Sequence, residues 1–467
     1  MSEHYHLIGI GGVGMGAIAS LLLDKGFKVS GSDLKENQIT ENLKKKGAQV
    51  FVGHSAENVR GADAVVYSSA VSQDNPELAF ARQNQIRILK RAQVLAWLME
   101  SQIGITVAGA HGKTTTTSMV SHLLITAGLC PTTAVGGIIN GGSYHASLGR
   151  GEYFVAEVDE SDGSFLYFSP HYSIITNIDF EHVDYYQNWE NILKAYGEFI
   201  EKTNPRGCLI ACGEDQKLLK LLSEKKRRFV SYGLSPASHL YAKNISCDGY
   251  FLTFDCIVHE KNMGEMRLRI PGRHNVLNAL ACTALGLELK IGFDVIQKSL
   301  NEFSGAQRRF QFKGEVAGVM VVDDYGHHPT EIKATLQAAR SFGRRVVVAF
   351  QPHRYSRTKF LMKEFAQSLQ SCDYLILTDI YAASEEPIEG ITSEALYQLI
   401  KKDADMPVVY LKKEDITDHL LGLAKAGDLV LTLGAGDIYR LTNSLIESFC
   451  IKLISSERLI RAFEKYS

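Results

Sequence analysis

The sequence predicts an α/β protein of three domains, each built on a mainly parallel sheet. The chain has 467 residues, which is more than one ordinary domain holds. Short apolar runs alternate with helical patterns in three successive stretches, which start at the N-terminus, near Ile103 and near Phe310. Hydrophobic residues make up 45% of the chain, enough to bury a core in each stretch. We therefore expect domains over residues 1–101, 102–309 and 310–467.

The first stretch has the pattern of a Rossmann-like domain. An apolar run at 6–10 predicts a strand, and the run at 16–26 predicts the helix that follows it. Further strands are expected at 28–33, 48–52 and 62–70. Alternating strands and helices of this kind form a parallel sheet with helices packed on it.

The second stretch resembles the α/β domain of a P-loop ATPase, with one irregular part. Its first strand is expected to start near Ile103 and to run into a second glycine-containing turn, and later strands are expected at 152–159 and 172–179. Residues 239–270 alternate between apolar and polar side chains, which predicts a small antiparallel excursion. Residues 272–290 predict a long helix.

The third stretch predicts a second Rossmann-like domain. Its apolar runs are separated by helical patterns, and the tail at 449–467 is amphipathic and predicts a packing helix. In a doubly wound sheet, functional groups lie at the carboxyl ends of the strands. The expected strands are 319–326, 344–352, 372–380, 406–411 and 428–436.

A glycine-rich turn, GIGGVGMG, follows the first expected strand and opens the first helix. Gly9, Gly11 and Gly14 fit the pattern G-x-G-x-x-G, and Asp33 stands about 20 residues further on, as in dinucleotide sites. The backbone amides of such a turn bind a diphosphate. NAD, FAD and a nucleotide-diphosphate sugar all satisfy this geometry. The alternative is that the glycines serve only close packing of the helix on the strand.

A second turn, ITVAGAHGKTTTT at 105–117, predicts a polyphosphate site. Its glycines point amides and a helix N-terminus at one spot, where Lys113 reaches the outer phosphates. The hydroxyl of Thr114 or Thr115 can ligate Mg²⁺. The spacing departs from a strict Walker A motif, because Val107 stands where the first glycine belongs. The alternative is an ordinary turn whose lysine faces water.

Two acidic segments follow later strands of the second stretch. AEVDESDGSF carries Glu157, Asp159 and Glu160, and TNIDFEHVDYY carries Glu181 and His182. Carboxylates repel one another unless a cation or proton intervenes, and hard oxygen ligands beside a phosphate turn suggest Mg²⁺. A solvated acidic turn and an ordinary polar histidine are the alternatives.

Polar residues also mark the end of the second stretch. Asn275 and Asn278, in PGRHNVLNALA, lie one helical turn apart and can bond an adenine or a ribose. Helix capping by Asn275 is the competing interpretation. GAQRRF at 305–310 places two guanidinium groups in an expected linker, where they suit bidentate phosphate contact.

Two strand ends of the third stretch predict a small-molecule pocket. One segment, VVDDYGHHPTE, carries an acid, a tyrosine and two histidines, and the other, FQPHRYSRT, carries a histidine and two arginines. A basic rim suits a small carboxylate, and an acid or histidine beside it can orient or deprotonate an amine. The residues are Asp324, Tyr325, His327, His328, His353, Arg354 and Arg357.

Composition narrows the partners. The formal net charge is -2, which gives no general attraction to nucleic acid or anionic lipid. The eight cysteines form no Cys-x-x-Cys pair, which is typical of reduced thiols, and no signal-type start or long apolar run is present. We expect a cytoplasmic protein without stable membrane association, as a monomer or a homodimer.

Taken together and in this order, these eight motifs resemble those of the Mur ligases, from about residue 5 to about residue 448. The resemblance implies three domains and ATP-dependent joining of L-alanine to the lactyl carboxylate of UDP-N-acetylmuramate through an acyl phosphate. It also implies ATP and Mg²⁺ as cofactors, and closure of the third domain over the second. One departure is Ala110, where the family's usual motif has threonine.

The resemblance also implies roles for individual residues. Lys113, Arg309, Asp324 and His327 are the expected catalytic residues. The expected ATP-binding residues are Gly109, Ala110, His111, Gly112, Lys113, Thr114, Thr115, Asn275 and Asn278. The UDP-sugar is expected at Gly11, Gly12, Val13, Gly14, Asp33, Ser69 and His111. Tyr325, His327, His353, Arg354 and Arg357 are expected to bind alanine, and Thr114, Glu157 and His182 to bind metal.

Three other functions stay open. A murein-peptide ligase takes the same UDP-sugar but joins it to a peptide amine. A nicotinamide-dependent oxidoreductase would use the first glycine turn and leave the second without a role. A nucleotide-binding module without catalysis would need Lys113 but not Glu157, His182 and Arg309 together.

Overall fold

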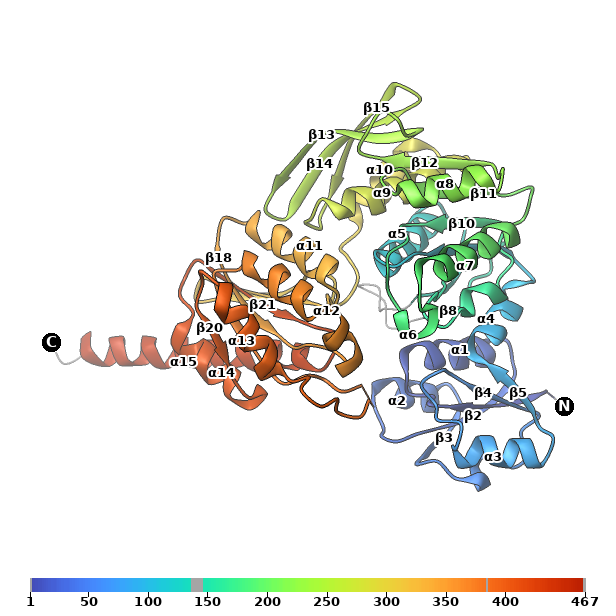
Figure 1. Ribbon diagram of the computed structural model, residues 1–467, viewed down its shortest axis with the longest axis horizontal. Coiled ribbons are helices and arrows are strands. Elements are labelled where there is room, and N and C mark those ends of the chain that lie inside the picture. Colours follow the sequence, from blue (N-terminus) through green and yellow to red (C-terminus); the bar gives the residue numbers. More distant parts are fainter. Residues whose placement is uncertain (1, 136–145, 384, 465–467) are drawn as a thin grey trace. The chain divides into compact units, whose positions relative to one another are not determined.

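The computed structural model describes residues 2–135, 146–383 and 385–464 (Figure 1). Its chain divides into two compact units. The first unit comprises residues up to Ile245 together with Phe254–Arg267 and Asn275–Phe303. The second comprises Ser246–Thr253, Leu268–His274 and the residues from Ser304 onward. Within the described residues, no helix is both long and apolar enough to cross a membrane.

The first sheet confirms the parallel pattern expected near the N-terminus. Its five strands run in the order β3-β2-β1-β4-β5, and each neighbouring pair is parallel. The strands are β1 (His4–Ile8), β2 (Lys28–Asp33), β3 (Gln49–Val52), β4 (Ala64–Tyr67) and β5 (Arg87–Lys90). The helices are α1 (Val13–Asp24), α2 (Gln38–Lys45), α3 (Pro76–Gln83) and α4 (Arg91–Met99), with a short 3₁₀ turn, η1 (Ala56–Val59).

The second sheet has ten strands in the order β15-β14-β13-β12-β11-β10-β6-β9-β7-β8. Its parallel part comprises β6 (Ile103–Ala108), β7 (Thr132–Ala134), β9 (Tyr153–Glu157), β10 (Tyr172–Ile175), β11 (Cys208–Cys212) and β12 (Phe229–Gly233), and β8 (Ala146–Ser147) pairs antiparallel with β7. The expected excursion forms β13 (Leu240–Asp248), β14 (Phe251–Val258) and β15 (Lys261–Leu268). Their two-residue connections require antiparallel pairing, so the prediction is confirmed.

The helices of this part include the one that begins at the lysine-containing turn. They are α5 (Lys113–Thr126), α6 (Val183–Tyr186), α7 (Trp189–Lys202), α8 (Gln216–Glu224), α9 (His274–Glu288) and α10 (Phe293–Glu302), with η2 (Ser164–Tyr167). One apolar core extends from Leu7 and Leu95 to Phe154 and Phe199. The first two expected domains therefore keep separate sheets but pack into one compact unit.

The third sheet has six strands in the order β16-β17-β21-β18-β19-β20. They are β16 (Gln311–Val316), β17 (Val319–Asp324), β18 (Arg345–Phe350), β19 (Tyr374–Leu377), β20 (Val408–Tyr410) and β21 (Asp428–Leu433). The helices are α11 (Pro329–Arg340), α12 (Tyr355–Ser368), α13 (Ser393–Asp403), α14 (Ile416–Leu423) and α15 (Leu441–Glu464), with 3₁₀ turns η3 (Leu369–Ser371), η4 (Lys413–Asp415) and η5 (Ile438–Arg440).

Alternating residues of these strands explain why helices cover both faces. Val346 and Val348 of β18 pack with Leu336 of α11 on one face, while Val347 and Ala349 pack with helix α14 on the other. This alternation follows from the two-residue period of a strand. The doubly wound prediction is confirmed.

One strand of this sheet was not anticipated. β16 pairs antiparallel with β17 at the sheet edge, with a register irregularity between Phe312 and Gly314. None of its six residues is fully buried, and its sequence, QFKGEV, lacks the continuous apolar run of a central strand. The tail is helical as expected, in α15 as far as Glu464, and residues 465–467 lie outside the described part.

Candidate active site

The first unit contains a cavity of about 610 Å³ beside the first glycine turn. Gly9, Gly12, Gly14 and Asp33 line it, together with Arg91 and the segment after β4. Of the residues expected to bind a UDP-sugar, Gly12, Gly14 and Asp33 are thus in its wall. Gly11 and Val13 belong to the same turn, Ser69 lies between the lining residues Ser68 and Ala70, and His111 lies in the second turn.

The carboxylate of Asp33 holds this turn in place. The Gly11 amide donates to Asp33 Oδ2 at 2.9 Å, and a Cβ at Gly11 would lie 2.9 Å from the same oxygen. A Cβ at Gly14 would lie 2.8 Å from Nη1 of Arg91. The glycines therefore allow a close approach of backbone and polar side chains, which is what a diphosphate site requires.

Arg91 is a cavity residue that the sequence analysis missed. It is the first residue of α4, directly after β5, and its guanidinium lies 3.8 Å from the Asp159 carboxylate. The sequence signal for Arg91 would have been a cation directly after a parallel strand. That strand, β5, is not among the strands expected from the sequence. An arginine here suits a diphosphate because it presents several donors at once.

The second turn joins β6 to α5, as expected. Gly112 has a φ of +82°, and a Cβ there would lie 2.7 Å from Oδ1 of Asn278. Asn278 also accepts from Thr116 at 3.2 Å and donates to Asn275 Oδ1 at 3.0 Å. The structure therefore brings both predicted asparagines to the lysine-containing turn. Asn278 thus contacts the side-chain oxygen of Asn275, and α9 begins at His274, one residue before Asn275.

Lys113 lies among oxygen atoms. Its Nζ donates to Gly109 O at 2.5 Å and to the carboxylate of Glu160 at 2.8 and 2.9 Å. Burial disfavours the ammonium, but the nearby carboxylates of Glu160 and Asp159 outweigh burial and raise the pKa of Lys113. The side chain is therefore a permanent positive charge at the N-terminus of α5.

The predicted metal ligands fall into two groups. Thr114 Oγ1 donates to Glu157 Oε1 at 3.0 Å, so these two residues are adjacent. His182 lies 3.6 Å from the carboxylates of both Glu160 and Glu181. Both acids follow strands of the second stretch, but neither is among the three expected metal ligands. This second group offers one imidazole nitrogen and one carboxylate oxygen from each acid, all within 4.8 Å of one another.

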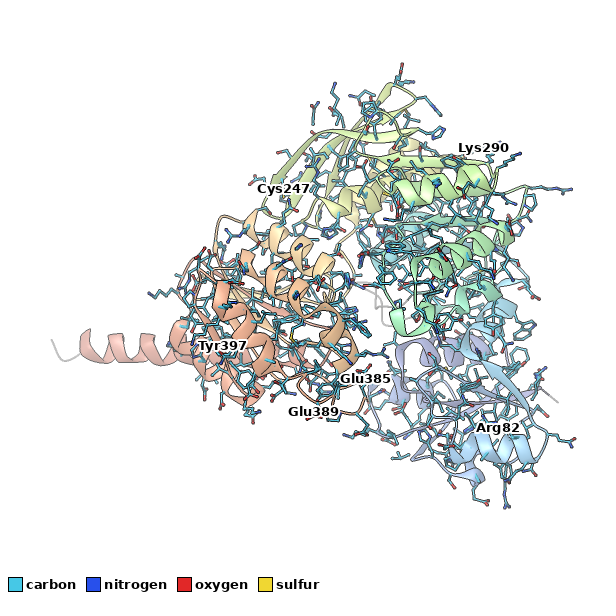
Figure 2. The ribbon with its side chains drawn as sticks, viewed as in Figure 1. Arg82, Cys247, Lys290, Glu385, Glu389 and Tyr397 are labelled. Carbon is cyan, nitrogen blue, oxygen red and sulfur yellow. The ribbon has the colours of Figure 1, made fainter. Side chains whose placement is uncertain are left out.

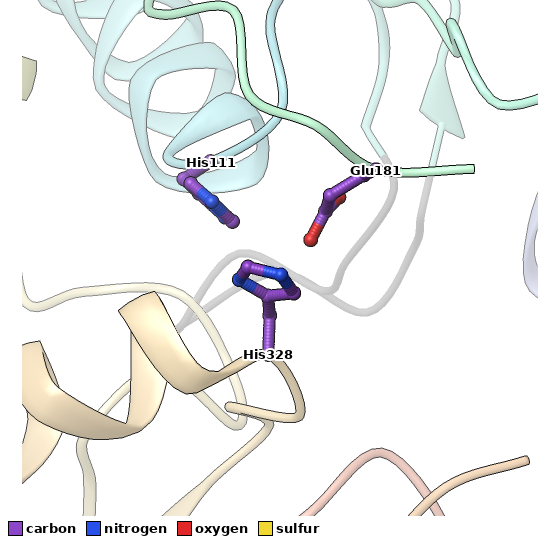
Figure 3. A group of neighbouring side chains, drawn as sticks. All are labelled: His111, Glu181 and His328. Atoms are coloured by element: carbon purple, nitrogen blue, oxygen red, sulfur yellow. The ribbon is translucent and has the colours of Figure 1, made fainter. Parts of the chain in front are cut away.

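His111 borders this region. Its Nε2 lies 2.9 Å from Asp179 Oδ2, and its backbone amide donates to Asn177. Figure 3 shows the His111 and Glu181 side chains of the first unit directed toward the same space, with ligand atoms within 4.8 Å of each other. His111 therefore lies with the metal candidates as well as in the predicted ATP-binding turn.

In the second unit, Asp324 ends β17 and is buried. It accepts hydrogen bonds from the amides of Phe310 and Gly326, both at 2.7 Å, and from Thr335 Oγ1 at 3.1 Å. Burial raises the pKa of Asp324 to about 6, although Arg309 opposes the rise. Three donors on one carboxylate mean that Asp324 organises the linker and the loop after β17.

The two predicted histidines of the third sheet are neighbours. The rings of His327 and His353 lie 5.9 Å apart, His327 packs edge-on against Tyr325, and His353 stacks on Tyr381. Burial lowers the pKa of His327 to about 3 and that of His353 to about 4. Both imidazoles are therefore neutral at pH 7. His328 instead caps α11, because its Nδ1 accepts from the Thr330 amide at 3.4 Å.

The predicted arginines begin α12. Arg354 has a φ of +73° and lies 3.7 Å from Glu385, a residue labelled in Figure 2. Arg357 Nη1 lies 3.2 Å from His353 Nδ1. Glu385 also accepts from the amide and hydroxyl of Ser356. The strand end, the helix start and this acid thus form a basic rim with one carboxylate.

The linker arginines differ in their surroundings. Arg308, which the sequence analysis did not choose, donates to Asp323 Oδ2 at 3.2 Å and to Gly434 O at 2.6 Å. Its guanidinium lies 4.8 Å from the ring of Tyr325 and 4.3 Å from that of Tyr439. Arg309, the predicted residue, lies 3.6 Å from Glu331. The Arg309 guanidinium also lies 5.3 Å from the centre of the Tyr325 ring, so both linker arginines have partners within the second unit.

Comparison with known proteins agrees with this organisation. Three family models match the chain in turn: "Mur ligase family, catalytic domain" over residues 4–102, "Mur ligase middle domain" over 107–286 and "Mur ligase, glutamate ligase domain" over 308–436. The chain is 48% identical to the UDP-N-acetylmuramate–L-alanine ligase of Trichlorobacter lovleyi, over 95% of this chain and 98% of that protein. The enzyme of the same name from Myxococcus xanthus is also 48% identical, over 95% and 94%.

Solved structures agree with the sequence relatives. The crystal structure of UDP-N-acetylmuramate–alanine ligase MurC from Thermotoga maritima superposes with a TM-score of 0.83 at 30% identity, covering 96% of this chain and 99% of that one. A murein peptide ligase from Psychrobacter arcticus shares the fold, with a TM-score of 0.72 at 24% identity, covering 96% and 99%. The chain belongs to the Mur ligase family.

Proposed function

We propose that this chain joins L-alanine to the lactyl carboxylate of UDP-N-acetylmuramate, with ATP converted to ADP and phosphate. The observation that carries the proposal is the turn at Lys113, with Thr114 and Glu157 in contact behind it. The names and the extent of the relatives support the choice of substrates. Because ATP and nucleotide sugars are made inside cells, we also propose that the reaction takes place in the cytoplasm.

ATP is needed because a carboxylate is a poor acyl donor. Transfer of the γ-phosphoryl group to the lactyl carboxylate makes an acyl phosphate and ADP. The amine of alanine then attacks the acyl carbon, and the tetrahedral intermediate expels phosphate. Phosphoryl transfer depends mainly on positioning and charge neutralisation, and Lys113 at the start of α5 supplies both for the phosphates. Asn275 and Asn278 are proposed to bond the nucleoside, and Thr115 to add a hydroxyl near the phosphates.

The donors of the first unit suit Mg²⁺. The hydroxyl of Thr114 and the carboxylate of Glu157 are hard oxygen ligands, as are the carboxylates of Glu160 and Glu181 beside His182. Bound there, Mg²⁺ would neutralise phosphate charge. We propose Thr114 and Glu157 as ligands of one ion and His182, with Glu160 and Glu181, as ligands of a second.

The second unit is proposed to bind alanine. Arg354 and Arg357 supply positive charge for its carboxylate, and Tyr325 and His353 form part of the wall. His327 is neutral, so its ring can accept a hydrogen bond from the amine. With a pKa of about 3, His327 is a weak base for the ammonium group of alanine. The carboxylate of Asp324 already accepts three hydrogen bonds, which hold the linker and the loop after β17. We therefore propose that the amine loses its proton to solvent before it attacks. Arg309 is proposed to contact the transferring phosphate.

A phosphate-release assay with purified protein tests the proposal. ATP, UDP-N-acetylmuramate and one amine are incubated together, the amine being alanine, glycine, serine or a murein tripeptide. Release that needs both the sugar and alanine supports the proposal. Release with the tripeptide but not with alanine would make the chain a murein-peptide ligase. No release in any mixture, with oxidation of a nicotinamide cofactor instead, would contradict the proposal.

A further inference from the structure

A fully buried carboxylate lies behind the cavity of the first unit. Glu77, in the first turn of α3, has no solvent exposure. It accepts hydrogen bonds from Ser32 Oγ at 2.6 Å and from Asn58 Nδ2 at 2.7 Å. Two imidazoles stand beside it, with His54 Nδ1 at 3.3 Å and His6 Nε2 at 3.6 Å. These partners offset the cost of burying a charge, which is high for a carboxylate without them.

Glu77 is ionised at neutral pH. Burial alone would raise its pKa, but the neighbouring His6 ring and the hydrogen bonds from Ser32 and Asn58 outweigh burial and lower the pKa of Glu77. The partners come from β1, from β2 and from the segment between β3 and α3. One carboxylate thus ties together separate parts of the wall around the cavity.

His54 connects Glu77 with the cavity. The side chain of His54 is 21% exposed and lines the cavity. Its Nδ1 lies 2.9 Å from Ser32 Oγ, and the single hydroxyl proton of Ser32 is donated to Glu77. Ser32 can therefore only accept from His54, which places a proton on Nδ1 of that ring. In a neutral imidazole this leaves Nε2 as a hydrogen-bond acceptor.

Ser32 also carries the network to the first glycine turn. Its carbonyl oxygen accepts from the amide of Gly9 at 2.8 Å and from that of Ile10 at 3.0 Å. Ser32 thus contacts Glu77 and His54 through its hydroxyl and the turn through its backbone carbonyl. Glu77 itself is not among the residues that line the cavity.

We propose that Glu77 is a positioning residue of this cavity, which sets the tautomer and the orientation of His54 so that Nε2 accepts a hydrogen bond from the bound ligand. The ligand is the uridine diphosphate part of a nucleotide sugar, an identification that rests on the proposed function. In the bound complex, an N–H or O–H donor of the uridine meets His54 Nε2.

The test is the binding of uridine diphosphate to the full-length chain by calorimetry. Glu77→Gln keeps the volume but removes the charge, and its amide group cannot accept from all of the present donors. We expect its dissociation constant for uridine diphosphate to rise about tenfold. The dissociation constant for ADP should stay within about twofold, and in the coupled reaction KM for the nucleotide sugar should rise while kcat changes little.

A double-mutant cycle separates positioning from a general loss of structure. If Glu77 acts through His54, then Glu77→Gln in a His54→Ala background should weaken uridine diphosphate binding by less than about twofold. The same tenfold loss with and without the ring would overturn the proposal. Glu57→Gln is the matched control, since Glu57 is an exposed acid of the neighbouring segment, paired with Arg60, and this variant should bind normally.

A second variant covers the case in which Glu77→Gln does not fold. Ser32→Ala removes the hydroxyl that accepts from His54 and donates to Glu77, so it should also weaken binding, again with little further effect in the His54→Ala background. Unchanged binding in Ser32→Ala would contradict the proposal.

Failure of the proposal and failure of the ligase function can be told apart. Weakened uridine diphosphate binding in Glu77→Gln, without phosphate release by the unaltered chain, would remove only the ligase function. If the unaltered chain releases phosphate but Glu77→Gln binds uridine diphosphate as tightly as the unaltered chain, only the positioning role is contradicted.

Discussion

The two glycine turns of the first unit share a backbone plan but differ in their side chains. Both follow the central strand of a parallel region and open a helix, β1 to α1 and β6 to α5. The first turn is held by Asp33 and faced by Arg91, with a cavity in front of it. The second carries Lys113 and contacts acids and Asn278. A strand–turn–helix thus makes an anion site, and the side chains around it decide which anion it suits.

Among the variants of the two turns, Lys113→Ala is expected to have the largest effect. Without the ammonium, phosphate release should fall by about a thousandfold or more, because charge neutralisation dominates phosphoryl transfer. Uridine diphosphate binding should stay within about twofold, since Lys113 belongs to the other turn. The measurements are phosphate release and calorimetry, with the exposed Lys194→Ala as control. A parallel loss of uridine diphosphate binding would break the division between the turns.

Glycine substitutions sharpen the contrast between the turns. Gly112 has a φ of +82° and no room for a Cβ beside Asn278, so Gly112→Ala should lower kcat/KM for ATP by about a hundredfold. Gly12 has a φ of -71°, and a Cβ there would meet only Gly9 O at 3.3 Å. Gly12→Ala should therefore change ATP kinetics by less than about threefold. Equal effects of the two variants on kcat/KM for ATP would argue against separate roles.

Acid should affect the second unit through His327. Its pKa is about 3 in the folded protein and 6.5 for an ordinary histidine, so the unfolded chain binds an extra proton between these values. The contribution of neutral His327 to the free energy of unfolding is therefore full above pH 6.5 and decreases as the pH falls below this value. Between pH 6.5 and 5 the loss from His327 is about 1.6 kcal/mol, a factor of about sixteen in the equilibrium.

Hydrogen exchange of the second-unit strands measures this loss. Wild type should lose more protection than His327→Gln when both are compared at pH 6.5 and at pH 5. An identical pH dependence in the two proteins would show that the burial of His327 is not coupled to stability. The amides around the two glycine turns serve as the internal control.

The smallest expected effect concerns the third substrate. Arg354→Ala should raise KM for alanine about tenfold through the lost charge, with KM for ATP and for the nucleotide sugar unchanged. Initial rates with each substrate varied in turn provide the measurement, and the exposed Lys359→Ala in the same helix is the control. An unchanged KM for alanine would remove Arg354 from the amino-acid pocket.

Much of the site was predictable, because its residues follow strands that the apolar pattern reveals. Glu157 ends β9, Lys113 begins the helix that follows β6, and His327 lies in the loop directly after β17. Arg91 was missed because β5 is short and only partly buried, so its strand was not recognised. Glu331 was missed as well, although it accepts from the amides of both His327 and His328.

The sequence by itself determined the α/β class, the three sheets and the two glycine turns that each open a helix, since these depend on local periodicity and on glycines within a few residues of one another. Only the tertiary structure decided that the first two sheets share one core, that Arg308 is anchored on Asp323, and that Glu77 lies beside His54. These contacts join residues from separate elements, many of them tens of positions apart. Strand order and side-chain packing, which local patterns do not encode, bring them together.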